Sequence, residues 1–186
     1  GLDFSLNFNF PYISTSLREF WTRWHISLST WFRDYVYIPL GGNRCGKARQ
    51  YFNLWVTMML SGIWHGAAWT FVCWGAAHSL FMSLERALRW PRFLSRLGRA
   101  GRIVSAVFVL FQVFLAWVFF RAGSVAQAFS ILKIMLLPRY WSLRGAGSLH
   151  EIVNMSSGSQ AVVFLCMAVF AEAFVFFGFH ESAFMK

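Results

Sequence analysis

The fold of this chain is decided by the stretch QYFNLWVTMMLSGIWHGAAWTFVCWGAAHSLFMSL, residues 50–84, which contains no Asp, Glu, Lys or Arg. One straight helix of this length would measure roughly 52 Å at 1.5 Å per residue. The hydrocarbon core of a bilayer is only about 30 Å thick, so the helix should break. The natural place is the segment GIWHG, residues 62–66, because glycines interrupt regular structure.

Basic residues flank this stretch on both sides. They are Arg44, Lys47 and Arg49 before it, and Arg86, Arg89, Arg92, Arg96, Arg99 and Arg102 after it. Because cytoplasmic loops are rich in Lys and Arg, both ends should face the cytoplasm. We therefore expect a broken helical hairpin over 51–85 with His65 at its tip, within the membrane depth. Its first arm, Tyr51 to Trp64, would be roughly 21 Å long, too short to cross fully.

The composition of the 186 residues is that of a membrane protein. Hydrophobic residues make up 58% and charged residues 13%, about half the charged share of a soluble domain. This disfavours a soluble enzyme and a disordered tail. The net charge of +10 is clustered between apolar runs, which favours contact with a lipid bilayer over nucleic acid. Three scattered cysteines (Cys45, Cys73 and Cys166) make neither a disulfide framework nor a zinc site.

The other segments complete an all-α, polytopic transmembrane fold in one domain, 1–186. In chain order we expect an amphipathic helix and basic turn (1–50), the hairpin (51–85), a basic cytoplasmic loop (86–102), a transmembrane helix (103–120), a loop with a short helix at Val125 to Leu137 (121–160) and a second transmembrane helix (161–179). The two spanning runs hold no charge and one acid, Glu172, respectively, and each is close to the ~20 residues that a crossing needs.

The N-terminal segment has an amphipathic pattern. Ser16 and Glu19 form a capping box, which predicts a helix start. An apolar stripe then recurs at helical spacing, which predicts one interfacial helix: Trp21, Trp24, His25, Leu28, Phe32 and Tyr35. The turn that follows, GGNRCGK at 41–47, imitates a phosphate-binding loop, but Ala48 stands where that motif needs Ser or Thr, so nucleotide hydrolysis is disfavoured.

Among the histidines, His65 is the strongest chemical candidate. An imidazole can act as a general base near neutral pH, and Gly62 and Gly66 would let a substrate come close to the backbone. Spacing alone leaves a neutral structural histidine equally open. For His25, on the apolar stripe, and for His78, within a helix, the residues alone favour a structural role. We expect no metal site and find no nucleophilic serine motif.

Three segments carry a resemblance to a known family: EFWTRWHISLSTWFRDYVYIPLGGNR (19–44), LSGIWHGAAWTFVCWGAAH (60–78) and WVFFRA (117–122). In this order they resemble the membrane-bound O-acyltransferase (MBOAT) family, most of all its bacterial branch that contains the alginate O-acetylation protein. The similarity runs from Leu2 to Met135. It implies the C-terminal part of a many-helix fold around a membrane-buried tunnel, a piece that would be inactive alone.

The resemblance also implies roles for individual residues. The family's central histidine, in its Trp-His-Gly motif, falls on His65, and a second, in its Trp-His-Ile-Ser motif, falls on His25, so both are expected to be catalytic. His65 would take a proton from an acceptor hydroxyl that attacks an acyl thioester, and His25 would orient the reacting groups. Asn43 and Arg44 would lie near the cytoplasmic mouth for the donor, with Trp64 as a further substrate-binding residue.

The same resemblance implies the reagents and the setting. The acyl donor would be acetyl-CoA or an acyl-carrier thioester, with no cofactor held by the protein. The enzyme would be an O-acetyltransferase of the bacterial inner membrane, with several crossings, that moves acetyl groups toward an exported, alginate-like polysaccharide. Transfer would be direct or through a periplasmic relay protein of the exopolysaccharide machinery.

Two other classes remain open. One is a transporter or channel, in which the broken hairpin lines a path marked by Gln112 and Glu172. The other is a non-catalytic membrane scaffold that recruits a soluble partner through its basic loops and tolerates the loss of both His65 and His25.

Overall fold

The computed structural model describes residues 6–137. Every regular element within that range is a helix and no strand occurs there, which confirms the predicted all-α class. The chain, expected to form one domain, divides into two compact units, Gly1–Ala128 and Phe129–Lys186, and each is considered by itself. The predicted spanning helix at 161–179, with Glu172, and the predicted loop beyond residue 137 lie outside the described residues.

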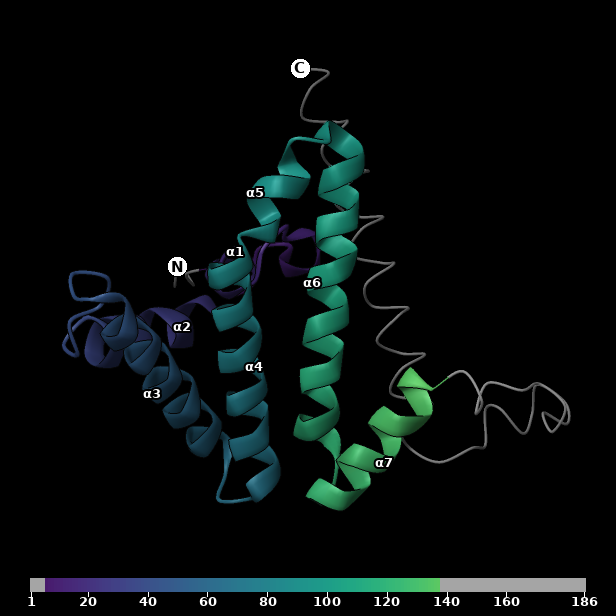
Figure 1. Ribbon diagram of the computed structural model, residues 1–186. Helices are drawn as coiled ribbons and strands as arrows, with labels where there is room; N and C mark the ends of the chain where they lie inside the picture. The colour runs from purple at the N-terminus through teal and green to yellow at the C-terminus, as the bar shows by residue number, and fades with distance from the viewer. Residues whose placement is uncertain (1–5, 138–186) are drawn as a thin grey trace, which may run out of the picture. The chain divides into compact units, whose positions relative to one another are not determined.

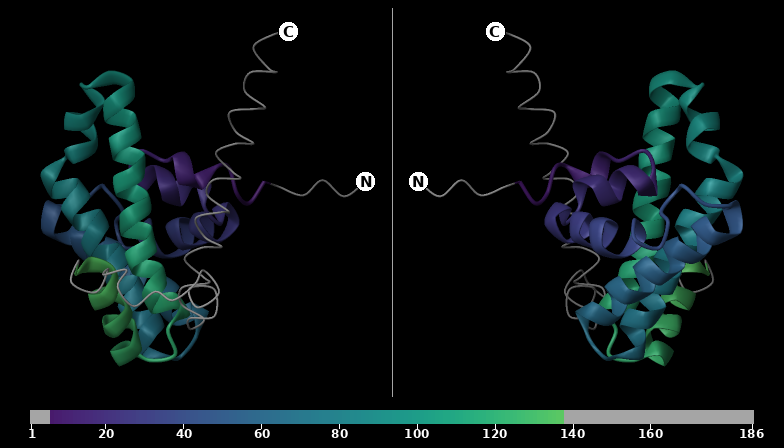
Figure 2. Two further views of the ribbon diagram at one scale, coloured as in Figure 1. Left: turned by 90° about the vertical axis from the view of Figure 1, so that its right-hand side faces the viewer. Right: turned by 90° about the vertical axis from the view of Figure 1, so that its left-hand side faces the viewer.

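Short connections join the helices of the first unit (Figure 1). In chain order the helices are η1 (Pro11–Ile13), α1 (Leu17–Arg23), α2 (Ile26–Phe32), the π-helix η2 (Arg33–Tyr37), α3 (Lys47–His65), α4 (Trp69–Leu88), α5 (Trp90–Ser95) and α6 (Gly98–Arg121); α7 (Val125–Leu136) begins here and continues into the second unit. The long helix α4 packs against α3 and against α6, while the short N-terminal helices lie beside them, α1 against α4 and η1 against α6 (Figures 1 and 2).

Helices α3 and α4 form a hairpin whose connection is residues 66–68. Helix α3 starts at Lys47 and ends at His65, and its 19 residues measure about 28 Å. The arm is therefore longer than the roughly 21 Å expected for Tyr51 to Trp64. The break falls after His65, at Gly66, whose φ of 155° suits glycine.

Two glycines let α3 and α4 pack very closely. Gly62 lies inside α3 rather than at the predicted break, and a Cβ there would collide with the Phe71 carbonyl of α4. A Cβ on Gly75 would lie 2.5 Å from the Met58 carbonyl oxygen of α3. Small residues of this kind permit backbone contact between helices in apolar surroundings.

Helix α6 is the one described helix that is long and apolar enough to cross a membrane. It begins at Gly98, before the predicted start at residue 103, and has 24 residues. The prediction of a basic loop over 86–102 was also wrong, because these residues form the end of α4, the whole of α5 and the start of α6. Gly101 of α6 packs directly on the Leu94 carbonyl of α5, which makes this a tight helical corner.

The single amphipathic helix predicted for the N-terminal segment was wrong, because the chain breaks between α1 and α2. His25 has a φ of 45° in the left-handed region. The physical reason is a distant partner: the Ile26 N–H donates to the Asn7 carbonyl (2.8 Å), and the Asn9 N–H donates to the Arg23 carbonyl (2.9 Å). The predicted helix start was correct, since the Ser16 hydroxyl accepts from the Glu19 N–H at 3.0 Å.

The core of this unit joins α1 to α6 and α4. Leu17 and Phe20 of α1 are fully buried against Val109 and Val113 of α6. Glu85, near the end of α4, accepts from the Leu17 N–H (2.6 Å) and the Arg18 N–H (3.4 Å). A carboxylate at a helix N-terminus satisfies free N–H groups and opposes the positive end of the helix dipole, so Glu85 holds α1 onto α4.

Replacing Gly75 with leucine should weaken the α3–α4 contact, because its side chain would enter the Met58 backbone. Overpacking of this kind costs about 1–3 kcal/mol, and we expect a lower thermal midpoint for the full-length protein in detergent. Gly46→Ala is the matched control, since nothing lies within 4 Å of a Cβ there. Equal midpoints for both variants would contradict the close packing.

Replacing Glu85 with glutamine should loosen α1, because the charged acceptor of two helix N-terminal donors is lost. We expect a stability loss of about 1–2 kcal/mol, measured by thermal unfolding of the full-length protein. Asp34→Asn is the control, because Asp34 pairs with Arg33 on the exposed surface at 2.7 Å and such pairs contribute little. A loss confined to Asp34→Asn would refute the role of Glu85.

Candidate functional site

His65 is the last residue of α3 and is surrounded by aromatic rings. Its imidazole lies 5.0 Å from the Trp64 ring, 5.2 Å from Trp74, 5.0 Å from Phe120 and 6.1 Å from Phe71, measured between ring centroids. The residue is only partly buried. It therefore combines an accessible proton acceptor with surroundings that hold little water.

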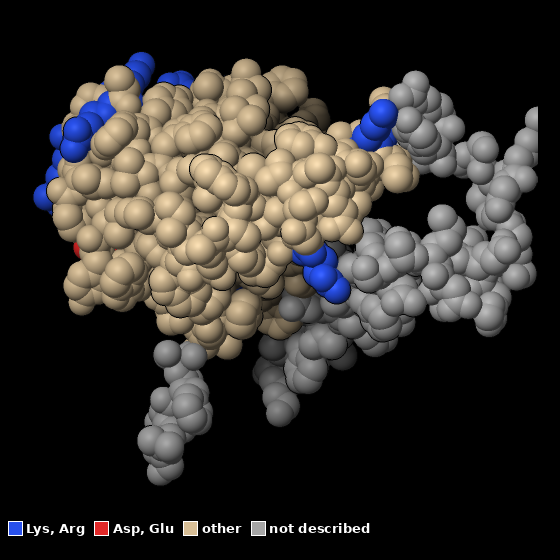
Figure 3. Space-filling view, turned by 90° about the horizontal axis from the view of Figure 1, so that it is seen from below, with Lys and Arg blue, Asp and Glu red and all other residues tan. Residues whose placement is uncertain are grey.

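His65 lies away from the arginine-rich end of the unit. Phe120 is the penultimate residue of α6, so His65 lies beside the last turn of that helix. The face seen from below in Figure 1 carries few charged side chains, and Lys and Arg lie mainly along one edge of it (Figure 3). The imidazole is thus about 27 Å along α3 from Lys47.

His25 lies in the break between α1 and α2, in contact with the Phe8 ring at 5.9 Å. Its Nδ1 atom is buried and has no hydrogen-bond partner among residues 6–137. The imidazoles of His25 and His65 interact electrostatically. This interaction is a repulsion between the charged forms of two side chains that lie forty positions apart in the sequence.

The predicted substrate-binding residues Asn43, Arg44 and Trp64 do not form one site around His65. Asn43 and Arg44 are exposed in the turn before α3, at its opposite end. The Asn43 side-chain oxygen accepts from the Tyr37 hydroxyl (2.8 Å) and from an Arg86 N–H (3.1 Å). Trp64 is next to His65 but is 59% exposed. These residues therefore belong to two places, one at each end of α3.

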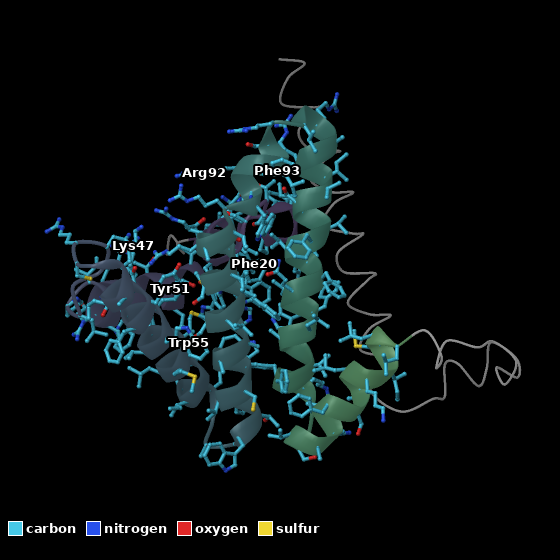
Figure 4. All side chains as sticks on the ribbon, viewed as in Figure 1. Phe20, Lys47, Tyr51, Trp55, Arg92 and Phe93 are labelled. Atoms are coloured by element: carbon cyan, nitrogen blue, oxygen red, sulfur yellow. The ribbon has the colours of Figure 1, made fainter. Side chains whose placement is uncertain are left out.

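A large groove lies along α3, from Asn43 in the turn before the helix as far as Ser61. It has a volume of about 1050 Å³ and is lined by residues of α1, α2, α3, α4 and α5. Cations line it toward the start of α3, among them Arg18, Arg33, Lys47, Arg86, Arg89 and Arg92. Glu85 is the acid among its lining residues, and its carboxylate is held by α1. Lys47 and Tyr51 of α3 and Arg92 of α5, which line the groove, are labelled in Figure 4.

The far part of the groove is uncharged. There it is lined by Trp21 of α1 and by Met58 and Ser61 of α3. Trp21 contacts Trp74 (5.9 Å between ring centroids), which in turn contacts His65. Sequence reasoning missed this groove, because arginines that are scattered along the chain meet only when α4 and α5 fold beside α1 and α3.

The described residues contain no group of three His, Cys, Asp or Glu side chains that could hold a metal ion. Gln112, a residue of the transporter alternative, is buried in α6 and donates to the Phe108 carbonyl of its own helix at 3.1 Å. Its side chain is thus satisfied within the helix. Cys45 and Cys73 are free thiols.

Comparison with known proteins agrees with the resemblance in the sequence. Residues 2–127 match the model of the MBOAT, membrane-bound O-acyltransferase, family. The chain is 41% identical over 170 residues to the probable alginate O-acetylase AlgI of Azotobacter vinelandii, covering 91% of this chain and 33% of that protein. It is 41% identical over 173 residues to the probable alginate O-acetylase AlgI of Pseudomonas aeruginosa, covering 91% and 32%.

A relative whose name gives a different activity is also similar. The chain is 40% identical over 132 residues to the peptidoglycan O-acetyltransferase of Helicobacter pylori, covering 70% of this chain and 25% of that protein. The chain thus spans about a third or less of the length of these relatives. On the family match and these identities, the chain belongs to the membrane-bound O-acyltransferase family.

Proposed function

We propose that this chain is part of a membrane O-acetyltransferase that moves an acetyl group from a cytoplasmic thioester toward an exported polysaccharide. The observation that carries the proposal is the accessible imidazole of His65 at the end of α3, within electrostatic reach of His25 and enclosed by four aromatic rings. The names of the relatives, alginate O-acetylase and peptidoglycan O-acetyltransferase, support this choice of reaction.

In this proposal His65 is the general base. It accepts the proton of an acceptor hydroxyl while the hydroxyl oxygen attacks the acyl carbon of the thioester. The thiolate then leaves and takes the proton back from His65, so the imidazole ends neutral. The aromatic rings limit access of water, which would otherwise hydrolyse the thioester. His25 orients the reacting groups, and the exposed Trp64 contacts substrate beside the base.

We further propose a multi-pass arrangement in the bacterial inner membrane. Helix α6 crosses the bilayer, and the α3–α4 hairpin lies beside it. The arginine-rich corner of α4, α5 and α6 faces the cytoplasm because basic residues are retained on that side. His65, beside the last turn of α6, then lies toward the opposite face, where a polysaccharide such as alginate, or a periplasmic relay protein, supplies the hydroxyl.

The cationic part of the groove supports a phosphate-bearing donor. Acetyl-CoA and the thioester of an acyl carrier both carry phosphate on the arm that ends in the thiol. Arginine guanidinium groups bind phosphate through paired N–H donors. Asn43 and Arg44 lie in the turn next to this mouth, which fits a role in admitting the donor rather than in the chemical step.

Replacing His65 with alanine should abolish acetyl transfer by the full-length protein, because the imidazole that accepts the proton of the hydroxyl is lost. Loss of a general base lowers the rate by roughly 10²–10⁴-fold. The measurement is O-acetyl content of the exported polysaccharide in cells that lack the native gene copy. Ile63→Ala, an exposed neighbour on α3, is the matched control.

Wild-type acetylation by the His65→Ala protein would exclude the catalytic role and favour a scaffold. Flux of a substrate across the membrane without formation of an acetyl ester would favour a transporter instead. Membrane fractionation of the variant shows whether insertion is preserved.

Replacing Arg92 with glutamate should weaken donor binding, because Arg92 lines the cationic part of the groove. We expect KM for acetyl-CoA to rise about tenfold, equivalent to about 1.4 kcal/mol, with kcat within twofold of wild type. Arg96→Glu, one turn further along and not among the groove-lining residues, is the charge-matched control. An equal rise in KM for both variants would mean that net charge alone attracts the donor.

A further inference from the structure

Three nitrogen-bearing rings, one of which contacts His65, have no role in the mechanism proposed above. We call Trp21, Trp74 and His78 the donor cluster. His78 is fully buried, and its ring lies 4.8 Å from Trp74 and 5.0 Å from Trp21 between centroids. Trp74 is 3% exposed and lies 5.9 Å from Trp21. The three rings thus contact one another, all edge to face.

The polar atoms of the donor cluster are buried and unsatisfied. The Nε1 atoms of Trp21 and Trp74 and both ring nitrogens of His78 have no hydrogen-bond partner among the residues that the structure describes. A buried N–H without a partner is costly, and native proteins rarely keep several together. Trp24 and Trp117, whose ring centroids lie 5.1 Å apart, show no such buried unpaired atom. Ser14, His25 and Asn53 each hold one further unpaired buried atom among the described residues, whereas the three contacting rings of the cluster hold four.

The chemistry of these atoms defines what would satisfy them. An indole N–H is a donor only, and a neutral imidazole offers one donor and one acceptor. The cluster therefore presents up to three donors and a single acceptor. Its complement is an oxygen atom with free lone pairs, and above all one that gains negative charge.

The position of the cluster is between the groove and the proposed base. Trp21 lines the uncharged part of the groove, together with Met58 and Ser61. Trp74 contacts the His65 imidazole on one side, at 5.2 Å, and His78 on the other. The cluster therefore joins a residue that lines the groove to the proposed base.

We propose that the donor cluster receives the carbonyl oxygen of the acyl thioester and stabilises the oxyanion formed on it. The inference rests on the proposed function. As the acceptor oxygen bonds to the acyl carbon, its proton moves to His65 and the carbonyl electron pair moves onto oxygen, which accepts from the cluster N–H groups. Collapse of this intermediate restores the carbonyl, breaks the carbon–sulfur bond and returns the proton from His65 to the thiolate.

The test removes one donor at a time from the full-length protein. Trp74→Phe and Trp21→Phe keep an aromatic ring but remove the N–H, and His78→Phe removes both ring nitrogens. Initial rates of transfer from radiolabelled acetyl-CoA to alginate in membranes give kcat and KM. We expect kcat to fall ten- to a thousandfold in Trp74→Phe, as for other oxyanion donors, with KM for acetyl-CoA within threefold.

Three further variants separate catalysis from packing. Trp117→Phe is the matched control, because the Trp117 ring contacts Trp24 and Tyr12 and is not part of the cluster. His78→Asn or His78→Gln restores an N–H donor, and one of them should recover part of the kcat lost in His78→Phe. Thermal midpoints are measured for every variant alongside the rates.

Each possible result either supports or overturns the inference. A lower midpoint with unchanged kcat, or equal kcat losses in Trp74→Phe and Trp117→Phe, overturns the inference and makes the cluster a packing element. A third outcome is that His65→Ala loses transfer while Trp74→Phe and His78→Phe keep the wild-type rate. This result overturns the oxyanion role of the cluster but leaves the proposed function intact. Absence of transfer by the wild-type protein with either thioester donor overturns the proposed function itself.

Discussion

The close contact between α3 and α4 at Gly62 and Gly75 is the constraint on which the rest of the structure depends. Backbone carbonyls of each helix fill the place of the missing side chains on the other. This contact sets the register of the hairpin, so that His65 at the end of α3 faces Trp74 in α4. A larger residue at either glycine would separate the helices and with them the imidazole and its aromatic surroundings.

Much of this arrangement is written locally in the sequence. An uncharged run with arginines on both sides predicts a hairpin, and the Trp-His-Gly motif predicts His65 at its turn. The mistakes arise where distant residues decide. The break at His25 depends on Asn7 and Asn9, whose carbonyl and N–H groups take the hydrogen bonds of a continuing helix. Periodicity within 16–35 cannot reveal a partner outside that segment.

The groove and the donor cluster show the same limit more strongly. Trp74 and His78 are four residues apart on α4, a spacing that predicts adjacent side chains. Their unpaired nitrogens become visible only once Trp21 of α1 closes over them. Likewise, the arginines near residues 86–92 predict a cytoplasmic side, whereas their convergence with Lys47 on one groove requires the folded hairpin. Sequence patterns identify the groups, and tertiary packing decides which of them meet.

The distance between the cationic residues near Lys47 and the imidazole of His65 has a physical reason if the proposed function holds. Phosphate must stay solvated or be met by arginine, and burying arginines beside a base would lower the proton affinity of that base by repulsion between like charges. Placing the cations near Lys47 and the imidazole at the other end of α3, about 27 Å away, avoids this conflict. On the proposed function, the donor that fits this arrangement is a long, flexible arm with its anionic part at one end and its thioester at the other. The uncharged part of the groove, beside Trp21, suits such an arm because the thioester end has no charge to desolvate.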